Sequence, residues 1–239
     1  MQSEVFKIPI EEFYEAATPY MEVMNGLDRD TAGARKSREK AMRIRSALFD
    51  GMTMDVLLAE FSRECVEEEA FVFEGTKIPC ADLSCIEKDI IKGGYIYMFH
   101  APMPDLSAFP VSKQYMADSW QTAFVDEGRN VLRERILKRA ESKYEGNCYI
   151  TDTIAPGVFG MEGTACRYFF EFLETERIGM EILKSGLMKP LKSFVGIFLI
   201  LDREGIKKTA DCRACLSGGK NCMYCKNYAE KLWAGKEKY

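Results

Sequence analysis

The run Phe194-Val195-Gly196-Ile197-Phe198-Leu199-Ile200-Leu201 is the longest apolar stretch of this 239-residue chain. It is too short to cross a bilayer as a helix, which takes about 20 residues. A short, continuously apolar run with many branched and aromatic side chains is typical of a strand buried on both faces. We therefore expect a central strand of a sheet here, and the rest of the fold is placed around it.

Helices and strands alternate through the remainder of the chain, which indicates the α+β class. A further helix is expected from Thr53, which can cap it, because the apolar side chains that follow recur at helical spacing. Its apolar residues are Met54, Leu57, Leu58, Phe61 and Cys65. Strands are expected at 5–10, 95–100, 147–154 and 178–183, and helices at 11–24, 33–49, 112–142 and 164–173.

The chain divides by composition into an N-terminal helical region (1–75), an α+β core (76–206) and a cysteine-rich tail (207–239). No repeat, low-complexity tract or proline-rich linker separates them. We expect them to form one compact unit.

Charge argues against a nucleic-acid partner. Lys and Arg total 33 and Asp and Glu total 37, so the formal net charge is −4. The helix expected at 33–49 is locally basic, but its cations do not share one helical face, which favours a solvated helix. The segment 1–7 lacks the basic start and apolar stretch of a secretion signal. A cytoplasmic protein without a membrane segment is expected.

Four of the nine cysteines are gathered in the tail, as Cys212-x2-Cys215-x6-Cys222-x2-Cys225. Two Cys-x-x-Cys turns can present four thiolates to one centre, and Gly218-Gly219 lets the connection fold back. In a reducing compartment this pattern indicates a metal rather than disulfides. Closed sites of four cysteines hold zinc, and four thiolates also hold iron–sulfur clusters. The spacing does not choose between the two.

His100 is the only histidine, so the chain alone cannot build a multi-histidine metal centre or an HExxH protease site. It follows a strand-like segment and precedes Ala101-Pro102. A structural role is favoured over a role in a pocket.

Two glycine-containing turns near the central strand form the candidate ligand site. The turns are expected at one end of the sheet, where lysine and serine side chains would offer donors to an anionic or carboxylate ligand. The alternative is a tight turn with solvated lysines. The candidate ligand-binding residues are Pro156, Gly157, Met188, Lys189, Pro190, Lys192, Ser193 and Gly196.

These segments carry a resemblance to a known family. Ile154-Ala155-Pro156-Gly157, then Glu176-Arg177-Ile178-Gly179-Met180-Glu181-Ile182, then the turn from Ser185 to Gly196 with its Met-x-Pro-x-x-Ser-x-x-Gly pattern resemble the activation domain of cobalamin-dependent methionine synthase. Small stand-alone relatives of that domain are more similar still. The resemblance is specific over residues 150–200 and diffuse over 93–142, and the methionine synthase domain lacks the cysteine tail.

The resemblance implies a curved antiparallel sheet with packed helices and a role in reactivating a corrinoid. The chain would assist the reduction and remethylation of cob(II)alamin on a partner, either a corrinoid-binding protein or a methyltransferase. The chain lacks the Asp-x-His-x-x-Gly pattern that supplies a cobalt ligand in many corrinoid carriers, so cobalamin would be held by that partner. An iron–sulfur cluster in the tail would relay the electron, whereas zinc would fix the tail.

Two alternatives to this function stay open. One is a non-catalytic docking module for a corrinoid protein, with a structural zinc. The other is a zinc-stapled regulator that uses the basic helix on nucleic acid, which the acidic total charge disfavours.

The chain departs from the family in the residues that contact S-adenosylmethionine. Thr153 and Val158 stand where the family's Arg-x-x-x-Gly-Tyr pattern has arginine and tyrosine, and Phe198 stands at a later tyrosine. S-adenosylmethionine is therefore a possible ligand that we expect to bind weakly or not at all. Whether the chain is itself an enzyme stays open.

Overall fold

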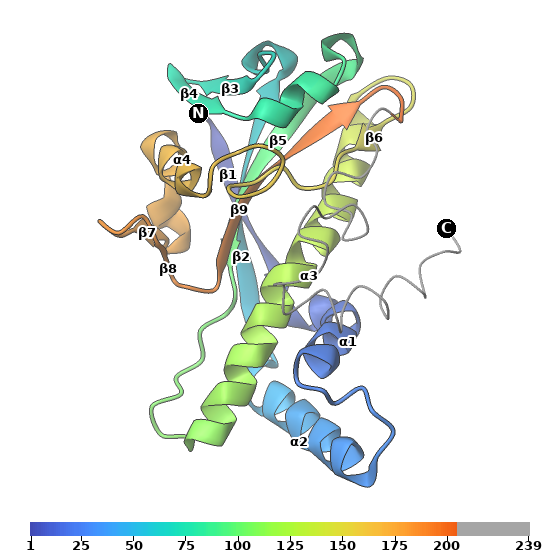
Figure 1. Ribbon diagram of the computed structural model, residues 1–239, viewed down its shortest axis with the longest axis vertical. Helices are drawn as coiled ribbons and strands as arrows, with labels where there is room; N and C mark the ends of the chain where they lie inside the picture. Colours follow the sequence, from blue (N-terminus) through green and yellow to red (C-terminus); the bar gives the residue numbers. More distant parts are fainter. Residues whose placement is uncertain (205–239) are drawn as a thin grey trace. The chain divides into compact units, whose positions relative to one another are not determined.

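A sheet of five strands, in the order β1-β2-β5-β9-β6, organises residues 1–204, the part of the chain that the computed structural model describes (Figure 1). β2 pairs with β5, β5 with β9 and β6 with β9, all antiparallel. The strands are β1 (Ser3–Pro9), β2 (Thr53–Ser62), β3 (Ala70–Phe73), β4 (Thr76–Pro79), β5 (Ile91–His100), β6 (Tyr149–Ile150), β7 (Glu181–Ile182), β8 (Met188–Lys189) and β9 (Ser193–Leu201). The helices are α1 (Tyr14–Met24), α2 (Ala32–Phe49), α3 (Val111–Lys143) and α4 (Cys166–Phe172).

The apolar run at 194–201 is an interior strand, as predicted. β9 lies between β5 and β6 and is buried from Val195 to Leu201. It pairs with β5 along almost its whole length, from Ile91 opposite Leu201 to His100 opposite Ser193. A strand with neighbours on both sides and cover on both faces needs apolar side chains throughout, which explains the unbroken run.

Alternate residues of these strands build two different surfaces. On one face Ile96, Met98 and Ile197 belong to a core that also contains Phe71 of β3 and Phe169 of α4. The opposite face carries aromatic and polar residues and meets the C-terminal part of α3. Because successive side chains of a strand point to opposite faces, neighbouring residues of β5 and β9 belong to different surfaces.

The chain separates into two compact units that are interleaved in sequence. Among the described residues, the first unit contains Met1–Lys7, Asp55–His100 and the chain from Arg129 onward, and the second contains Ile8–Met54 and Ala101–Gly128. In the second unit, the Trp120 indole donates to the Ala41 carbonyl at 3.0 Å, and the Arg45 guanidinium carbon lies 3.9 Å from the Tyr14 ring centroid. The first unit holds the sheet surfaces considered below.

The predicted helix at Thr53 is wrong: Thr53–Ser62 is strand β2. Most of its residues are buried, on both sides of the strand, and an apolar run of this kind satisfies helical and strand spacing equally well. Seven pairs with β5, from Val56 opposite Phe99 to Ser62 opposite Gly93, decide the conformation. The N-terminal region therefore contains sheet strands as well as helices.

Two predicted strands are much shorter than expected. The strand expected at 147–154 is reduced to Tyr149–Ile150, followed by an isolated bridge between Ile154 and Ile197. The strand expected at 178–183 is reduced to Glu181–Ile182, because Thr175–Ile178 forms a 3-10 turn that ends at Gly179. The helices expected at 11–24, 33–49, 112–142 and 164–173 are confirmed as α1 to α4.

Within residues 1–204, none of the helices combines the length and apolar composition needed to cross a membrane.

Candidate functional site

An aromatic surface lies where β5 and β9 pair. Tyr97 and Phe99 of β5 and Phe194 and Phe198 of β9 project to the same face, because partners and alternate residues share a side of a sheet. The Tyr97 ring stacks on Phe198 at 4.5 Å between centroids and on Phe194 at 6.1 Å. We call these four residues the aromatic surface.

Gly196 makes room for Tyr97 at the centre of this surface. The two residues are partners across the β5–β9 ladder. A Cβ atom on Gly196 would lie 2.6 Å from the Tyr97 hydroxyl oxygen and 3.0 Å from Thr153 Cγ2. Real Cβ atoms do not come within 2.6 Å of another heavy atom, so Tyr97 can lie over β9 only because residue 196 is glycine.

Tyr97 and Thr153 form a hydroxyl pair beside Gly196. Their side-chain oxygens are 2.8 Å apart. Burial raises the pKa of Tyr97, and the charge of Arg129 opposes this only in part, so the phenol is neutral at physiological pH. The Arg129 guanidinium carbon lies 5.5 Å from the Phe194 ring centroid. The Tyr97 hydroxyl and three of the aromatic rings are buried, and Phe194 and Thr153 are the half-buried residues through which a ligand could reach this place, with Arg129 nearby.

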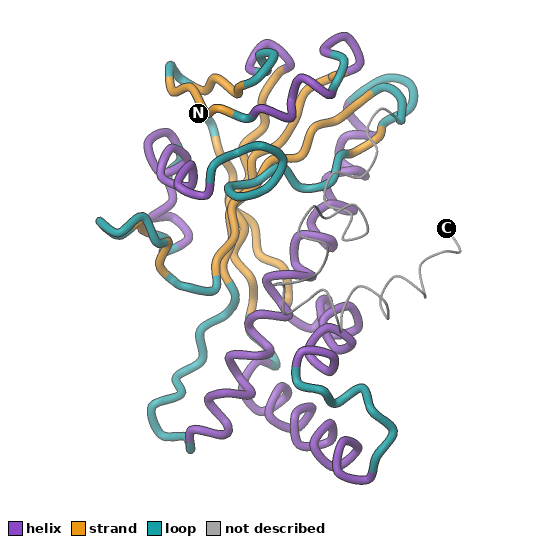
Figure 2. Tube along the Cα trace, viewed as in Figure 1, coloured by secondary structure: helices purple, strands orange, loops and turns teal. Residues whose placement is uncertain are grey.

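The chain after β6 is a loop beside the sheet (Figure 2). Its contacts with β9 bring Thr153 next to Gly196 and Tyr97. The Thr151 and Ile154 amides donate to the carbonyls of Leu199 and Ile197, both at 3.0 Å. Arg133 of α3 donates to the carbonyls of Ile150 and Thr151 at 2.7 and 2.9 Å. The loop is therefore anchored from both the strand and the helix.

The predicted Pro156–Gly157 turn follows directly. Gly157 has a φ of 84°, and its amide donates to the Met161 carbonyl at 2.9 Å. Gly157 is exposed, and no atom would lie within 4 Å of a Cβ built there. Its backbone is therefore open to a ligand or a partner.

The second predicted turn is engaged with its own neighbours. Met188 and Lys189 form β8, which pairs with β7 in a separate two-stranded ribbon. The Lys189 ammonium lies 2.7 Å from a Glu181 carboxylate oxygen. Ser193 donates its hydroxyl to the Pro190 carbonyl, and Lys192 is half-buried. Among the predicted residues of β9 and the turn before it, Gly196 is the one that packs against Thr153, in the loop after β6.

Tyr97 and Arg129 are site residues that the sequence did not reveal. Tyr97 falls in the strand predicted at 95–100, but its partner Thr153 is fixed by the pairing of β9 with both β5 and the loop. His100, in contrast, has Nε2 2.9 Å from the Ile178 carbonyl oxygen, which fits a structural role.

The predicted metal ligands Cys212, Cys215, Cys222 and Cys225 lie outside the described residues. Across residues 1–204, no three His, Cys, Asp or Glu side chains gather closely enough to hold a metal ion.

Comparison with known proteins identifies the fold. No protein-family model matches this chain, and no curated protein matches it in sequence. Among solved structures it is similar to one described as the MetH reactivation domain bound to AdoHcy, with a TM-score of 0.61 over 88% of this chain and 82% of that one. Sequence identity is 14%, so the likeness shows the fold alone. The α+β class, with a curled antiparallel sheet and packed helices, is that of the MetH reactivation domain.

Proposed function

We propose that this chain is a reactivation factor for a corrinoid methyltransferase system, assisting the reduction and remethylation of cob(II)alamin on a partner protein. The observation that carries the proposal is the likeness of fold to the MetH reactivation domain over 88% of the chain. Residues 154–157, 176–182 and 185–196 support it, because they resemble the same family in sequence.

The location of the corrinoid on a partner agrees with the chemistry of His100. This is the only histidine of the chain, and its ring contacts a backbone carbonyl in the first unit. Loops held by a rigid sheet usually carry function, so the exposed Pro156–Gly157 turn is the proposed docking side.

We further propose that S-adenosylmethionine binds weakly or not at all. Thr153 stands at the family's arginine position and engages Tyr97, so a guanidinium that could pair with the ligand's carboxylate is missing from the loop. Arg129 brings a guanidinium to the same region from α3, beside Phe194. Titration calorimetry with S-adenosylmethionine is the direct measurement, and tight binding would contradict this part of the proposal.

The four tail cysteines are proposed to hold one metal centre, either zinc or an iron–sulfur cluster. Visible absorption of anaerobically purified protein distinguishes the two. A brown protein would support electron transfer by a cluster, whereas a colourless protein with one zinc per chain would support a structural staple.

A docking module without catalysis is the second candidate. The exposed side chains of Leu183, Leu187 and Leu191, which are 41%, 57% and 76% accessible, favour a protein-binding surface around the β7–β8 ribbon. Sedimentation with the cob(II)alamin-loaded corrinoid protein of the same organism tests association for both candidates. Absence of a complex would contradict both, and a complex that leaves the rate of cobalt reduction unchanged would leave only the docking module.

A further inference from the structure

A hollow of about 280 Å³ lies in the first unit, away from the Tyr97–Thr153 pair. Its lining includes Glu4 of β1, Leu58 and Glu60 of β2, Tyr95 of β5 and Arg139 of α3. The hollow therefore lies between the C-terminal part of α3 and three neighbouring strands. Pockets of about 300 Å³ and more are typical of small-ligand sites.

Tyr95 places an unsatisfied hydroxyl at this hollow. The residue is fully buried, and its hydroxyl oxygen has no hydrogen-bond partner among the described residues. Tyr97 is equally buried on the same strand and face, but its hydroxyl pairs with Thr153. Most buried polar groups are hydrogen-bonded, and a group that is not calls for a functional explanation. A ligand atom in the hollow would satisfy Tyr95.

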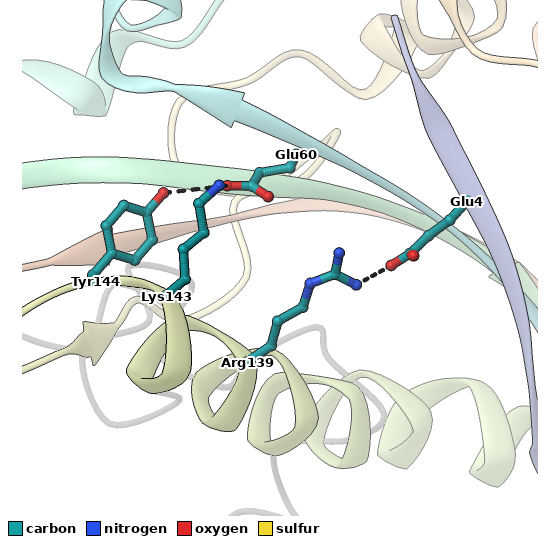
Figure 3. A network of polar contacts seen from close by, with 5 residues as sticks. All are labelled: Glu4, Glu60, Arg139, Lys143 and Tyr144. Atoms are coloured by element: carbon teal, nitrogen blue, oxygen red, sulfur yellow. Dashed lines mark hydrogen bonds and ion pairs between the residues drawn. The ribbon is translucent and has the colours of Figure 1, made fainter.

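Glu4, Glu60 and Arg139, which line the hollow, take part in two ion pairs (Figure 3). Arg139 pairs with Glu4, and Lys143 pairs with Glu60. The Tyr144 hydroxyl also donates to Glu60, at 3.4 Å. Burial, together with the charge of Glu60, raises the pKa of Tyr95, and Arg139 beside the hydroxyl opposes this only in part, so the phenol is a neutral donor at physiological pH.

The two ion pairs can exchange partners at little cost. All four side chains are partly exposed, between 27% and 50%, and such pairs contribute little to stability. A ligand carboxylate can therefore take the Arg139 guanidinium and the Tyr95 hydroxyl, while a ligand ammonium takes the released Glu4 and Glu60. An anion alone would take Arg139 from Glu4, and a cation alone would take Glu4 from Arg139, so a zwitterion is the ligand that keeps both charges paired.

A second hollow, of about 270 Å³, shares Glu4, Leu58 and Arg139 with the first. Its further lining consists of Phe6, Arg135 and Ile136. The hollow thus adds the apolar side chains of Phe6 and Ile136, and one more cation, beside the charged groups.

We propose that the hollow at Tyr95 binds an α-amino acid with an apolar side chain. Its carboxylate would accept from Arg139 and Tyr95, its ammonium would donate to Glu4 and Glu60, and its side chain would lie toward Phe6 and Ile136. This site shares no residue with the Tyr97–Thr153 pair and does not depend on the proposed corrinoid function.

The test is titration calorimetry of the full chain with three matched probes. L-leucine carries both charges, 4-methylpentanoate lacks the ammonium, and 3-methylbutylamine lacks the carboxylate. L-leucine is expected to bind at least about tenfold more tightly than either analogue, because it alone preserves the charge balance. Equal affinities for the three, or no binding of L-leucine, would overturn the proposal.

Two tyrosine variants assign the binding to the unsatisfied hydroxyl. Tyr95→Phe is expected to weaken L-leucine binding about tenfold and to leave the thermal midpoint of the free protein unchanged or raised. Tyr97→Phe is the matched control, expected to lower the midpoint and leave L-leucine affinity unchanged. L-leucine binding that is the same in Tyr95→Phe and the natural protein would show that the Tyr95 hydroxyl takes no part in it and would overturn the proposal.

Discussion

Tyr95 and Tyr97, two residues apart on β5, differ in the partner of the hydroxyl group. Both are fully buried residues of β5 on the face toward α3, but only Tyr97 meets a second hydroxyl, that of Thr153. Alternation along 95–100 predicts that both side chains share a face. This alternation does not predict which group each tyrosine hydroxyl meets. That partner depends on the register of β9 with β5 and with the loop after β6.

The Tyr97–Thr153 pair is expected to stabilise the protein. Tyr97→Phe and Thr153→Val should each lower the free energy of unfolding by about 1 kcal/mol, because each leaves the other hydroxyl without its partner. The double variant should lose less unfolding free energy than the sum of the two single losses. A double-mutant cycle by urea denaturation measures this difference. Strictly additive losses would mean that the two hydroxyls do not interact.

Cys80 gives stability a defined pH dependence. Its thiol is buried, with Sγ 3.0 Å from the Phe159 carbonyl oxygen, and burial raises its pKa from an ordinary 9.0 to about 12. Above pH 9 the unfolded chain releases the thiol proton while the folded chain keeps it. The thiol's contribution is therefore complete below pH 9 and is lost as the pH rises toward 12.

Between pH 8 and pH 10, this thiol should cost the natural protein about 1 kcal/mol of unfolding free energy that Cys80→Ala does not lose. Urea denaturation of both proteins at the two pH values measures the difference. Parallel losses in the two proteins would show that the Cys80 thiol titrates normally in the folded state.

At the scale of elements, the hydrophobic pattern of the sequence predicts β9 correctly and β2 incorrectly. The run at 194–201 is too short for a long helix and apolar throughout, so burial on both sides was readable from sequence. The segment 53–62 satisfies both helical and strand spacing, and only its seven pairs with β5 decide between them. The ends of β6 and β7 could not be predicted from composition. β6 is followed by an isolated bridge to distant Ile197, and β7 is preceded by a 3-10 turn.

The candidate site, too, was predictable where the signal is local and was not predictable where it depends on contacts between distant segments. The Pro156–Gly157 turn and Gly196 were found as local sequence signals, and the structure places Gly196 against Thr153. Tyr97 and Arg129 come from segments far away in the sequence, so no local pattern could connect them with the turn.

Gly196 allows a direct test of the close packing between β9 and β5. In Gly196→Ala, the new Cβ would lie 2.6 Å from the Tyr97 hydroxyl and 2.8 Å from Cζ, and the Tyr97 ring is buried and stacked against Phe198 and Phe194. Overpacking of this kind should cost about 1–3 kcal/mol of unfolding free energy. Gly163→Ala is the control, because no atom would lie within 4 Å of its Cβ. Equal stability of the two variants would contradict the tight fit.

For the whole molecule, the described part of the chain already contains a large apolar core in the first unit, from Leu57 to Leu201. Cys222→Ser should therefore lower the metal content of the purified protein while circular dichroism and the unfolding transition of the sheet are kept. Metal analysis and thermal unfolding provide the two readouts. Full metal occupancy in this variant would contradict a centre held by Cys212, Cys215, Cys222 and Cys225.

The central claim, reactivation of a corrinoid on a partner protein, is tested most directly by the rate of cob(II)alamin loss. Anaerobic visible spectroscopy follows the loaded corrinoid protein of the same organism, with a chemical reductant and S-adenosylmethionine, with and without this chain. We predict a faster loss of cob(II)alamin when the chain is present. Lys192→Glu should reduce this effect most at low salt, and Lys184→Glu, an exposed lysine on the β7–β8 ribbon, is its control. An unchanged rate at saturating concentrations of the chain would contradict the proposed function.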